Sequence, residues 1–319
     1  MRGTLIVSLD FELFWGMLDC STVEAYGPNV LGGRKAIPQM LELFRKYDIH
    51  ATWATVGFLF ARDFEELKRY FPDESSFPTY RDDALLPYPL FDKIGVNEQE
   101  APCFYGESLV RMVSEAPGQE IGSHTFSHFY CREKGQTPEQ FAADMRAAKQ
   151  IAADHGYDVT SVILPRNQCE PEYTQVLRSL GFTAYRDEEN DWIHEKISFR
   201  PLKRLLRLAD VYIPLTGMGG YHPKNEDGIW NLVGSRMYKP IFRPLRFLER
   251  VKLMRIKAQM RHAAKKGLTF HLWWHPHNVG VETEEHLRQL EEIFRYYEQL
   301  REKYGMQSLN MREVVELNR

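Results

Sequence analysis

Two carboxylates stand at the end of the first apolar run of this sequence, in TLIVSLDFE. Leu5, Ile6, Val7 and Leu9 make a short apolar run with β-branched residues, which predicts a buried strand. Alternation along a strand places Asp10 and Glu12 on one side and Phe11 on the other. Because burying an unpaired charge costs free energy, acids at such a position usually serve a metal ion, a basic partner or a reaction. The alternative is that they cap the following turn.

Two histidines follow a second predicted strand, QEIGSH at residues 119–124. His124 and His128 have HxxxH spacing, and one helical turn would place both imidazoles on the same face, at a spacing suited to one metal ion. Together with one carboxylate they would form a ligand set that leaves positions for water and substrate. HxxxH alone is common by chance, so the strand before it and the acids after the first strand make the pattern more specific.

A third predicted strand, LTFHLWWH at residues 268–275, also ends in polar residues, beginning with His275. Strands alternate with helices along the chain, which predicts a parallel sheet. In a barrel of parallel strands, the carboxyl ends of the strands carry the chemistry. The other elements that we predict are a loop at 17–33, helices at 34–47, 138–155, 171–180 and 282–304, and strands at 50–57, 161–164, 182–185, 211–215 and 308–309.

Residues 61–103 interrupt this alternation with prolines and aromatic residues and no clear period. Because a structureless segment of this length is unusual in a compact domain, we interpret it as an insertion that folds over one face, as a lid or a substrate loop. The chain contains no internal repeat and no low-complexity linker. We therefore expect a single domain, residues 1–319, with an insertion at 61–103 after the second strand.

Composition gives no sign of a nucleic-acid or transmembrane protein. The 319 residues are 43% hydrophobic with a net charge of −3, which is ordinary for a globular protein with a large core. No apolar run approaches the roughly 18 residues of a membrane helix. The first run is too short for a signal peptide, and the four cysteines are scattered, so we expect a cytoplasmic protein with free thiols.

Residues 240–267 form a basic, helical segment with nine Lys or Arg residues and one acid, Glu249. A solvated helix face is the usual explanation of such a segment. The other explanation is contact with an anionic partner, either a membrane surface or a phosphate-linked substrate.

Taken in order, these motifs resemble those of the polysaccharide deacetylases, the NodB-homology group of carbohydrate esterase family 4. SLDFE at 8–12 resembles the family's acidic first motif, and SHTFSH at 123–128 fits its metal-binding second motif. The remaining three motifs correspond to LPRNQ at 164–168, the stretch 185–192, and LWWH at 272–275. The resemblance implies a distorted (β/α)7-type barrel and the hydrolysis of an N-acetyl group from a sugar.

The resemblance also implies roles for individual residues. Asp10 would be the general base, and His275 would be the general acid that protonates the leaving amine. Arg166 would orient Asp10, although it follows Pro165 where the family's arginine precedes the proline.

A divalent metal ion, with zinc the expected ion, would be bound by His124, His128 and a carboxylate. In the commonest form of the first motif a second Asp binds the metal, and Phe11 stands at that position here. Some branches of the family have a similar Asp-x-Asp/Glu form, so we expect Glu12 to replace the missing ligand.

Tryptophans are the candidate aromatic faces for a sugar ring. Of Trp15, Trp192, Trp273 and Trp274, we expect one or two to contact the sugar, and we select Trp15, Trp192 and Trp274 as substrate-binding residues.

The leading hypothesis is a cytoplasmic, metal-dependent deacetylase of an N-acetylated sugar, in the form of a nucleotide- or lipid-linked precursor of a surface polysaccharide. A second hypothesis is a C–N hydrolase of a small cyclic amide or ureide, because allantoinase-like relatives carry a similar Asp-Phe-Glu and some need no metal. A third is a carbohydrate-binding protein without activity. Asp10 and His275 argue against the third, since a binder needs no acid–base pair.

Overall fold

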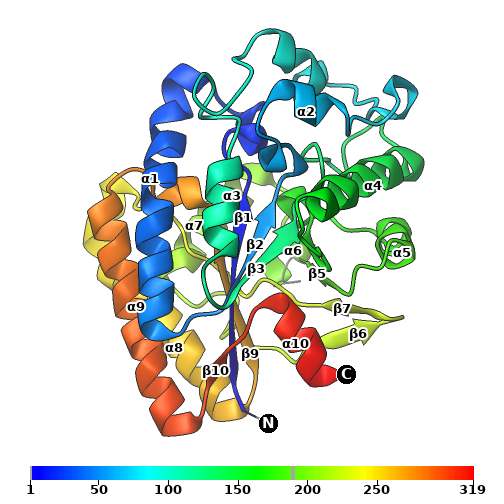
Figure 1. Ribbon diagram of the computed structural model, residues 1–319. Helices are drawn as coiled ribbons and strands as arrows, with labels where there is room; N and C mark the ends of the chain where they lie inside the picture. Colours follow the sequence, from blue (N-terminus) through cyan, green and yellow to red (C-terminus); the bar gives the residue numbers. More distant parts are fainter. Residues whose placement is uncertain (1, 188–190) are drawn as a thin grey trace.

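A ten-stranded, mostly parallel β-sheet with helices on both faces forms the centre of the protein (Figure 1). The computed structural model describes residues 2–187 and 191–319. The strands are β1 (Thr4–Phe11), β2 (Ala51–Thr55), β3 (Gln119–Ser123), β4 (Ser161–Ile163), β5 (Ala184–Arg186), β6 (Lys224–Glu226), β7 (Ile229–Asn231), β8 (Arg236–Met237), β9 (Thr269–Trp274) and β10 (Gln307–Ser308).

The strand order is β6-β7-β5-β4-β3-β2-β1-β9-β8, with β10 beside β1. All pairs are parallel except β6 with β7. Within the described residues, the outer strands β6 and β8 do not pair with each other, so the sheet is open at this point. The parallel sheet predicted from the alternation of elements is confirmed.

Helices cover the sheet in two groups. In Figure 1, α1, α8 and α9 lie along one flank of the sheet, and α4 and α5 lie on the other. The helices are α1 (Val23–Tyr47), α2 (Phe64–Lys68), α3 (Glu107–Ser114), α4 (Pro138–Asp154), α5 (Pro171–Ser179), α6 (Trp192–Lys196), α7 (Arg200–Tyr212), α8 (Glu249–Lys266), α9 (Thr283–Tyr304) and α10 (Met311–Asn318). Each helix in the described part of the chain is too short or too polar to cross a membrane.

Strand β1 is the longest strand and lies in the interior of the sheet. All eight of its residues are buried, and it pairs with β2, β9 and β10. The ring of Phe11 packs edge-on against Trp53 in the main core, on the side opposite Asp10 and Glu12. The predicted alternation at the end of this strand is therefore confirmed, and it directs both carboxylates away from the apolar layer.

The start of α1 differs from the prediction. Residues 17–33 were expected to form a loop because they include prolines and glycines, yet the helix begins at Val23, with Thr22 as its N-cap. The reason is tertiary: a Cβ at Gly32 would lie 1.9 Å from the carbonyl oxygen of Gly280, and one at Gly33 would lie 2.8 Å from the Cα of His277. The glycines therefore allow the helix to pack directly against the turn that follows β9.

The strand predicted at 211–215 is also wrong, because residues 200–212 form α7. The apolar residues of α7 recur at helical spacing among basic ones, and this period outweighs the short β-branched run at its end. The strand that extends the sheet beyond β5 is β7.

The insertion at 61–103 contains α2 and several 3₁₀ turns, and it lies over the carboxyl ends of the strands (Figure 1). Its aromatic residues pack together: Phe77 stacks on Tyr88 with ring centroids 3.7 Å apart. Arg34 of α1 holds the C-terminal end of the insertion. It forms an ion pair with Glu98 and donates hydrogen bonds to the backbone carbonyls of Pro102 and Tyr105. A lid role for this segment stays a prediction.

We predict that Gly32→Ala lowers the free energy of unfolding by about 1–3 kcal/mol, because the new methyl group would meet backbone atoms that cannot move aside. Gly27→Ala, in the same helix, is the matched control: its Cβ would have ordinary contacts, 3.4 Å or more. The control should leave stability unchanged or raise it by up to about 1 kcal/mol. Chemical denaturation of the two variants tests this, and equal effects would contradict the packing argument.

Candidate active site

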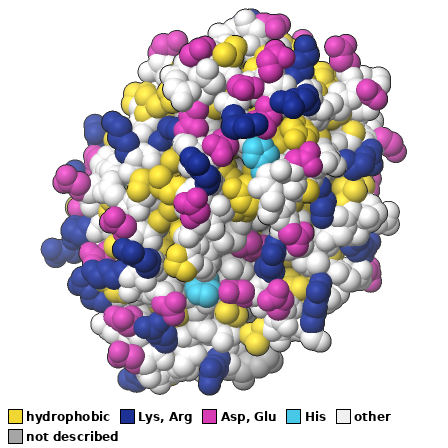
Figure 2. Space-filling model, in the orientation of Figure 1, with side chains coloured by type: hydrophobic (Ala, Val, Ile, Leu, Met, Phe, Trp, Pro, Cys, Tyr) yellow, Lys and Arg dark blue, Asp and Glu magenta, His cyan; other side chains and the backbone are white. Residues whose placement is uncertain are grey.

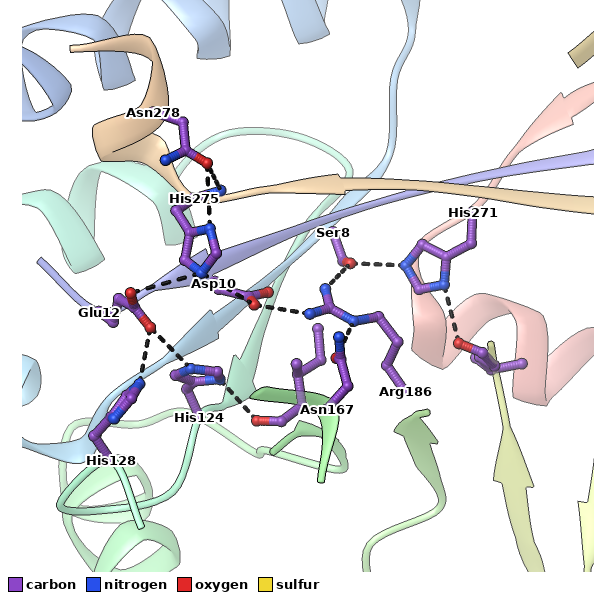
Figure 3. Close-up of polar contacts among 12 residues, drawn as sticks. Ser8, Asp10, Glu12, His124, His128, Asn167, Arg186, His271, His275 and Asn278 are labelled. Carbon is purple, nitrogen blue, oxygen red and sulfur yellow. Dashed lines mark hydrogen bonds and ion pairs between the residues drawn. The ribbon is translucent and has the colours of Figure 1, made fainter. Parts of the chain in front are cut away.

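The side chains that could do chemistry meet at the carboxyl ends of the parallel strands (Figure 3). Asp10 is the second-to-last residue of β1, and Glu12 is the first residue after the strand. His124 follows β3, Arg186 ends β5, and His275 follows β9. The sheet therefore brings together residues that are up to 265 positions apart in the chain.

Glu12 and two histidines form a compact cluster. Glu12 Oε2 lies 3.1 Å from Nε2 of His124 and 2.9 Å from Nε2 of His128. All three side chains are buried, and one ligand atom of each lies within 4.8 Å of the others. The predicted ligand residues are thus placed together around a single point.

The two histidines do not lie on a helical turn, so that part of the prediction is wrong. Residues 124–130 form an irregular loop in which Thr125 and His128 have positive φ values, 65° and 60°. Asp144 holds this loop, since its carboxylate accepts hydrogen bonds from the backbone N–H groups of Phe126 and Ser127 and from the Ser127 hydroxyl.

Asp144 comes from α4, whose start was predicted from sequence. Thr137 and Gln140 cap each other's backbone N–H groups, with Pro138 at the first helical position. Burial raises the pKa of Asp144 to about 6 despite its three hydrogen bonds. The capping box at Thr137 therefore sets where α4 begins, and α4 carries Asp144, which holds the loop of His124 and His128.

The protonation of His124 indicates that the cluster fits a metal ion. Nδ1 of His124 lies 2.7 Å from the carbonyl oxygen of Ile163, which can only accept, so Nδ1 carries a proton. In the neutral ring, Nε2 then turns a lone pair toward the Glu12 carboxylate. That arrangement is repulsive unless a cation lies between them, either a proton or a metal ion. Burial lowers the pKa of His128, which favours its neutral, metal-binding form.

The position of Glu12 depends on Gly16. A Cβ at Gly16 would lie 2.2 Å from Glu12 Oε1 and 2.3 Å from its carboxyl carbon. The turn after β1 thus lets backbone contact the carboxylate directly, which sequence reasoning missed.

His275 faces both carboxylates. Its Nε2 lies 3.6 Å from Asp10 Oδ2 and 3.6 Å from Glu12 Oε1. Asn278 Oδ1 accepts the backbone N–H of His275 and lies 3.2 Å from its Nδ1, which therefore carries a proton. The ring of His277 stacks on that of His275, with centroids 5.0 Å apart. His275 is thus oriented with Nε2 toward the space between the two acids.

The arginine beside Asp10 is Arg186, and the prediction that Arg166 orients Asp10 is wrong. Arg186 Nη2 donates to Asp10 Oδ2 over 2.7 Å, and its side chain is fully buried. Arg166 instead pairs with Asp19 and Glu133 at the surface. The backbone explains the difference, because Arg166 and Asn167 have φ values of 58° and 50°. This turn directs Asn167 inward, and its Oδ1 accepts from Arg186 Nε.

A buried hydrogen-bond network fixes Arg186. Its Nη1 donates to Ser8 Oγ over 2.8 Å, and Ser8 lies 2.7 Å from His271 Nε2. His271 Nδ1 contacts the carbonyl of Leu232, and burial lowers the pKa of His271 to about 3, so the ring is neutral. The Trp273 ring packs against the guanidinium of Arg186, whose central carbon lies 4.2 Å from the ring centroid. Arg186 falls in the predicted fourth-motif stretch, of which residues 188–190 lie outside the described residues.

The charges around the two carboxylates keep them ionised. Burial raises the pKa of Asp10, but the charges of Arg186, His275 and His124 outweigh it and hold the pKa below its ordinary value. Burial likewise raises the pKa of Glu12, while nearby imidazoles hold it well below its ordinary value. The Oδ1 atom of Asp10 is buried and has no hydrogen-bond partner among the described residues.

Two of the predicted substrate tryptophans are core residues. Trp15 and Trp274 are 1% and 0% exposed, so neither can present a ring face to a sugar. Trp15 packs among aromatic rings of the insertion side and donates from Nε1 to the carbonyl of Phe104. Trp192 is 39% exposed, and its contact with a substrate stays a prediction. Trp273 is half-buried and lies against Arg186, close to the centre.

Comparison with known proteins gives one family. A family model described as polysaccharide deacetylase matches residues 26–185, which are 160 of the 319 residues and include both histidines of the cluster. A comparison with curated protein sequences finds no match.

Solved structures show the same fold. A putative polysaccharide deacetylase from Mycobacterium smegmatis has a TM-score of 0.62 at 12% identity, over 99% of this chain and 90% of that one. A probable polysaccharide deacetylase from Pseudomonas aeruginosa PAO1 has a TM-score of 0.57 at 11% identity, over 98% and 89%. The PuuE allantoinase has a TM-score of 0.53 at 13% identity, over 98% and 89%. The predicted barrel-type α/β fold is confirmed.

We predict that Gly16→Ala weakens the binding of a divalent metal ion by the cluster about 10- to 100-fold without unfolding the protein. The new methyl group would displace the Glu12 carboxylate, which is the movable end of a side chain, while the backbone at residue 16 tolerates alanine. Zinc titration with a competing chelator and a thermal melt measure the two effects. Gly27→Ala serves as the control, and unchanged zinc affinity in Gly16→Ala would contradict the role of this contact.

We also predict that Arg186→Lys lowers kcat about 100-fold, because lysine cannot hold Asp10, Ser8 and Asn167 at once. Arg166→Lys should have a much smaller effect, since Arg166 pairs with acids at the surface. The test is a comparison of the two variants at saturating substrate once an active substrate is found. A larger loss in Arg166→Lys would restore the role first assigned to Arg166.

Proposed function

The chain belongs to the polysaccharide deacetylase family of carbon–nitrogen hydrolases, and we propose that it is a metal-dependent enzyme that removes an N-acetyl group from a sugar, working as a single catalytic domain. One observation carries this proposal. At the carboxyl ends of the parallel strands, the side chains of Asp10 and His275 face the same point as the cluster of Glu12, His124 and His128. A base, an acid and a set of metal ligands are together what a metal-assisted hydrolysis of an amide uses.

Glu12, His124 and His128 would hold the divalent cation, for which we propose zinc, since neutral imidazoles and a carboxylate suit that ion. Such a cation supplies a Lewis acid that polarises the acyl carbonyl and makes water more acidic. The protein's part is to keep the three ligands together. Ile163, Asp144 and Gly16 fix their orientations through the contacts described above.

Asp10 would act as the general base. Its Oδ2 is held by Arg186, and its Oδ1 has no partner among the described residues, so that atom can accept the proton of the attacking water. The water oxygen bonds to the acyl carbon. Arg186 contributes by keeping Asp10 ionised and by fixing the direction of the carboxylate.

His275 would act as the general acid. Asn278 holds the proton on Nδ1, so a second proton on Nε2 faces the two carboxylates and can pass to the leaving nitrogen. As the C–N bond breaks, the nitrogen takes this proton and leaves as an amine, and the acyl group leaves as acetate.

For the substrate we propose a nucleotide- or lipid-linked N-acetylated sugar, a precursor of a surface polysaccharide, processed in the cytoplasm. A cavity of about 350 Å³ supports a sugar substrate, because it is lined by Trp273 and Asn167, which lie beside Arg186. Trp273, and Trp192 at its more exposed position, are the candidate faces for the sugar ring.

A second candidate is hydrolysis of a small cyclic amide or ureide. It is favoured by the fold shared with the PuuE allantoinase and by the Asp-Phe-Glu sequence at residues 10–12. The Glu12–histidine cluster supports the metal-dependent deacetylase instead. A carbohydrate-binding role without catalysis is less supported, because a binder has no need of the oriented pair Asp10 and His275.

We predict two classes of variant at the centre. Glu12→Ala, His124→Ala and His128→Ala each lose bound metal and turnover, because each removes a ligand of the cluster. Asp10→Asn keeps the metal and loses about 10²–10⁴-fold in kcat, because it removes only the base. Plasma mass spectrometry of the purified proteins gives the metal content, and acetate release from N-acetylated sugar nucleotides and lipid-linked sugars gives the turnover.

Thermal melts of all four variants provide the control for folding. Metal loss in Asp10→Asn with metal retained in Glu12→Ala would mean that the two carboxylates have exchanged roles. A wild-type protein that binds no zinc or cobalt, yet hydrolyses a cyclic ureide, would favour the second candidate.

A further inference from the structure

Exposed apolar side chains gather on one part of the surface. Of the fifteen large hydrophobic residues that are exposed among the described residues, nine lie between residues 192 and 254. The most exposed of these include Phe199 (67%), Leu205 (62%) and Phe247 (76%). The face in Figure 2, by contrast, carries acidic and basic side chains of both signs spread among small hydrophobic areas.

Helix α7 combines these apolar residues with cations. Four Lys or Arg residues alternate with leucines in RPLKRLLRLADVY, and its single acid, Asp210, is buried in ion pairs with Arg236 and Arg255. Helices with this composition bind to anionic membrane surfaces. In the basic segment 240–267, Lys252 and Arg255 are buried and paired inside the protein. An anionic contact of the segment stays a prediction, and α7 adds a second surface of this kind beside residues 240 and 242.

A groove runs along α7. It has a volume of about 630 Å³ and lies between α7 and residues 239–242. Five of its ten lining residues are cations and none is an acid, while Leu208, Val211 and Phe242 are among the apolar ones. The groove thus offers positive charge and apolar surface side by side, which is the complement of a phosphate ester with a hydrocarbon chain.

The groove joins the cavity beside the catalytic centre. Arg207, Val211 and Lys239 line both the groove and the 350 Å³ cavity. The cavity ends at Trp273 and Asn167, which contact the arginine that holds Asp10. Four of the cavity's cations pair with Asp191, Asp210 or Glu249, and these acids lie beside the cavity, whereas the groove lining contains no acid.

We propose that the groove and the cavity together bind a sugar that is joined through phosphate to a long apolar chain. The proposal rests on the proposed function, and it selects the lipid-linked form of the substrate. The sugar would lie in the cavity toward Trp273, the phosphate beside the groove cations such as Arg204, and the chain along Leu208 and Phe242.

The exposed surface around α7 favours a lipid carrier over a nucleotide. Phe199 directly before α7, Leu205 within α7 and Phe247 are exposed, and each is next to an arginine in the sequence, which suits the interface of an anionic bilayer. The base and ribose of a nucleotide also need hydrogen-bond acceptors, and the groove lining has no acidic, amide, Ser or Thr side chain: its one side-chain acceptor is the Tyr212 hydroxyl. The occupant to which we commit is therefore a long-chain alcohol phosphate, delivered from a membrane surface.

The test is binding of geranylgeranyl phosphate to the full-length protein, measured by calorimetry, with geranylgeraniol and uridine diphosphate as comparison ligands. The phosphate ester should bind at least about tenfold more tightly than either. Arg204→Glu and Leu208→Ser, two residues of the groove lining, should each weaken it about tenfold or more. Equal binding of uridine diphosphate, or binding that neither substitution weakens, would overturn the proposal.

Matched variants elsewhere control for general effects. Leu317→Ser removes a leucine with the same 62% exposure as Leu205 from α10, and Arg261→Glu reverses an exposed charge on α8 within the basic segment. Both should bind geranylgeranyl phosphate as the wild type does. Sedimentation with phosphatidylcholine vesicles, with and without phosphatidylglycerol, should show binding only to the anionic vesicles and its loss in Leu205→Ser. A loss in Leu317→Ser of the same size would overturn the assignment to α7.

These measurements need no turnover, so the two proposals can fail separately. A protein that binds geranylgeranyl phosphate through α7 but releases no acetate from any substrate would refute the deacetylase function and support the groove. A protein that deacetylates sugar nucleotides and does not bind the lipid phosphate would refute the groove and leave the deacetylase function in place.

Discussion

The structure depends on the compensation of two negative charges buried at the end of its central strand. Asp10 and Glu12 are 3% and 4% exposed, where an unpaired carboxylate would be costly. Arg186 compensates Asp10 through a direct hydrogen bond. Glu12 has no arginine or lysine beside it among the described residues and instead faces imidazoles. The two acids thus have different environments, which is how neighbouring carboxylates acquire different tasks.

Those environments are built from several layers of contacts. Arg186 can hold Asp10 because Ser8, Asn167 and Trp273 hold Arg186. The histidine loop can present two Nε2 atoms to one oxygen because Asp144 satisfies its backbone donors. Such supporting contacts fix the direction of a ligand or a base more narrowly than the strand end alone could.

The carboxyl ends of the strands also connect the catalytic side chains to the protein surface. Trp273 lies against Arg186 on one side and lines the cavity on the other, and the cavity continues into the groove of α7. The insertion at 61–103 covers the edge from another direction (Figure 1). Catalytic residues and substrate-selecting surfaces therefore come from different segments, as is usual when function is carried by loops on a common barrel scaffold.

The sequence by itself determined the features that are local. The apolar run before Asp10 is enough to place a buried strand, and the capping box at Thr137 is enough to start α4, because both depend on neighbours a few residues away. The order of motifs likewise indicated the family. The spacing of His124 and His128 indicated a ligand pair, which the structure brings together with Glu12, but it did not indicate the left-handed loop that does so.

Only the tertiary structure decided the choices that depend on distant partners. Arg166 follows the short strand β4 and Arg186 ends the short strand β5, and a turn with two positive φ values at Arg166 and Asn167 decides which of them reaches Asp10. Trp273 and Trp274 are adjacent in sequence, yet alternation sends Trp274 into the core and Trp273 toward the cavity. Helix α1 begins before its glycines because a turn 250 residues away packs against them. In each case the deciding free energy is that of a contact between segments far apart in the chain. A local sequence pattern depends only on neighbouring residues, so it cannot predict such a contact.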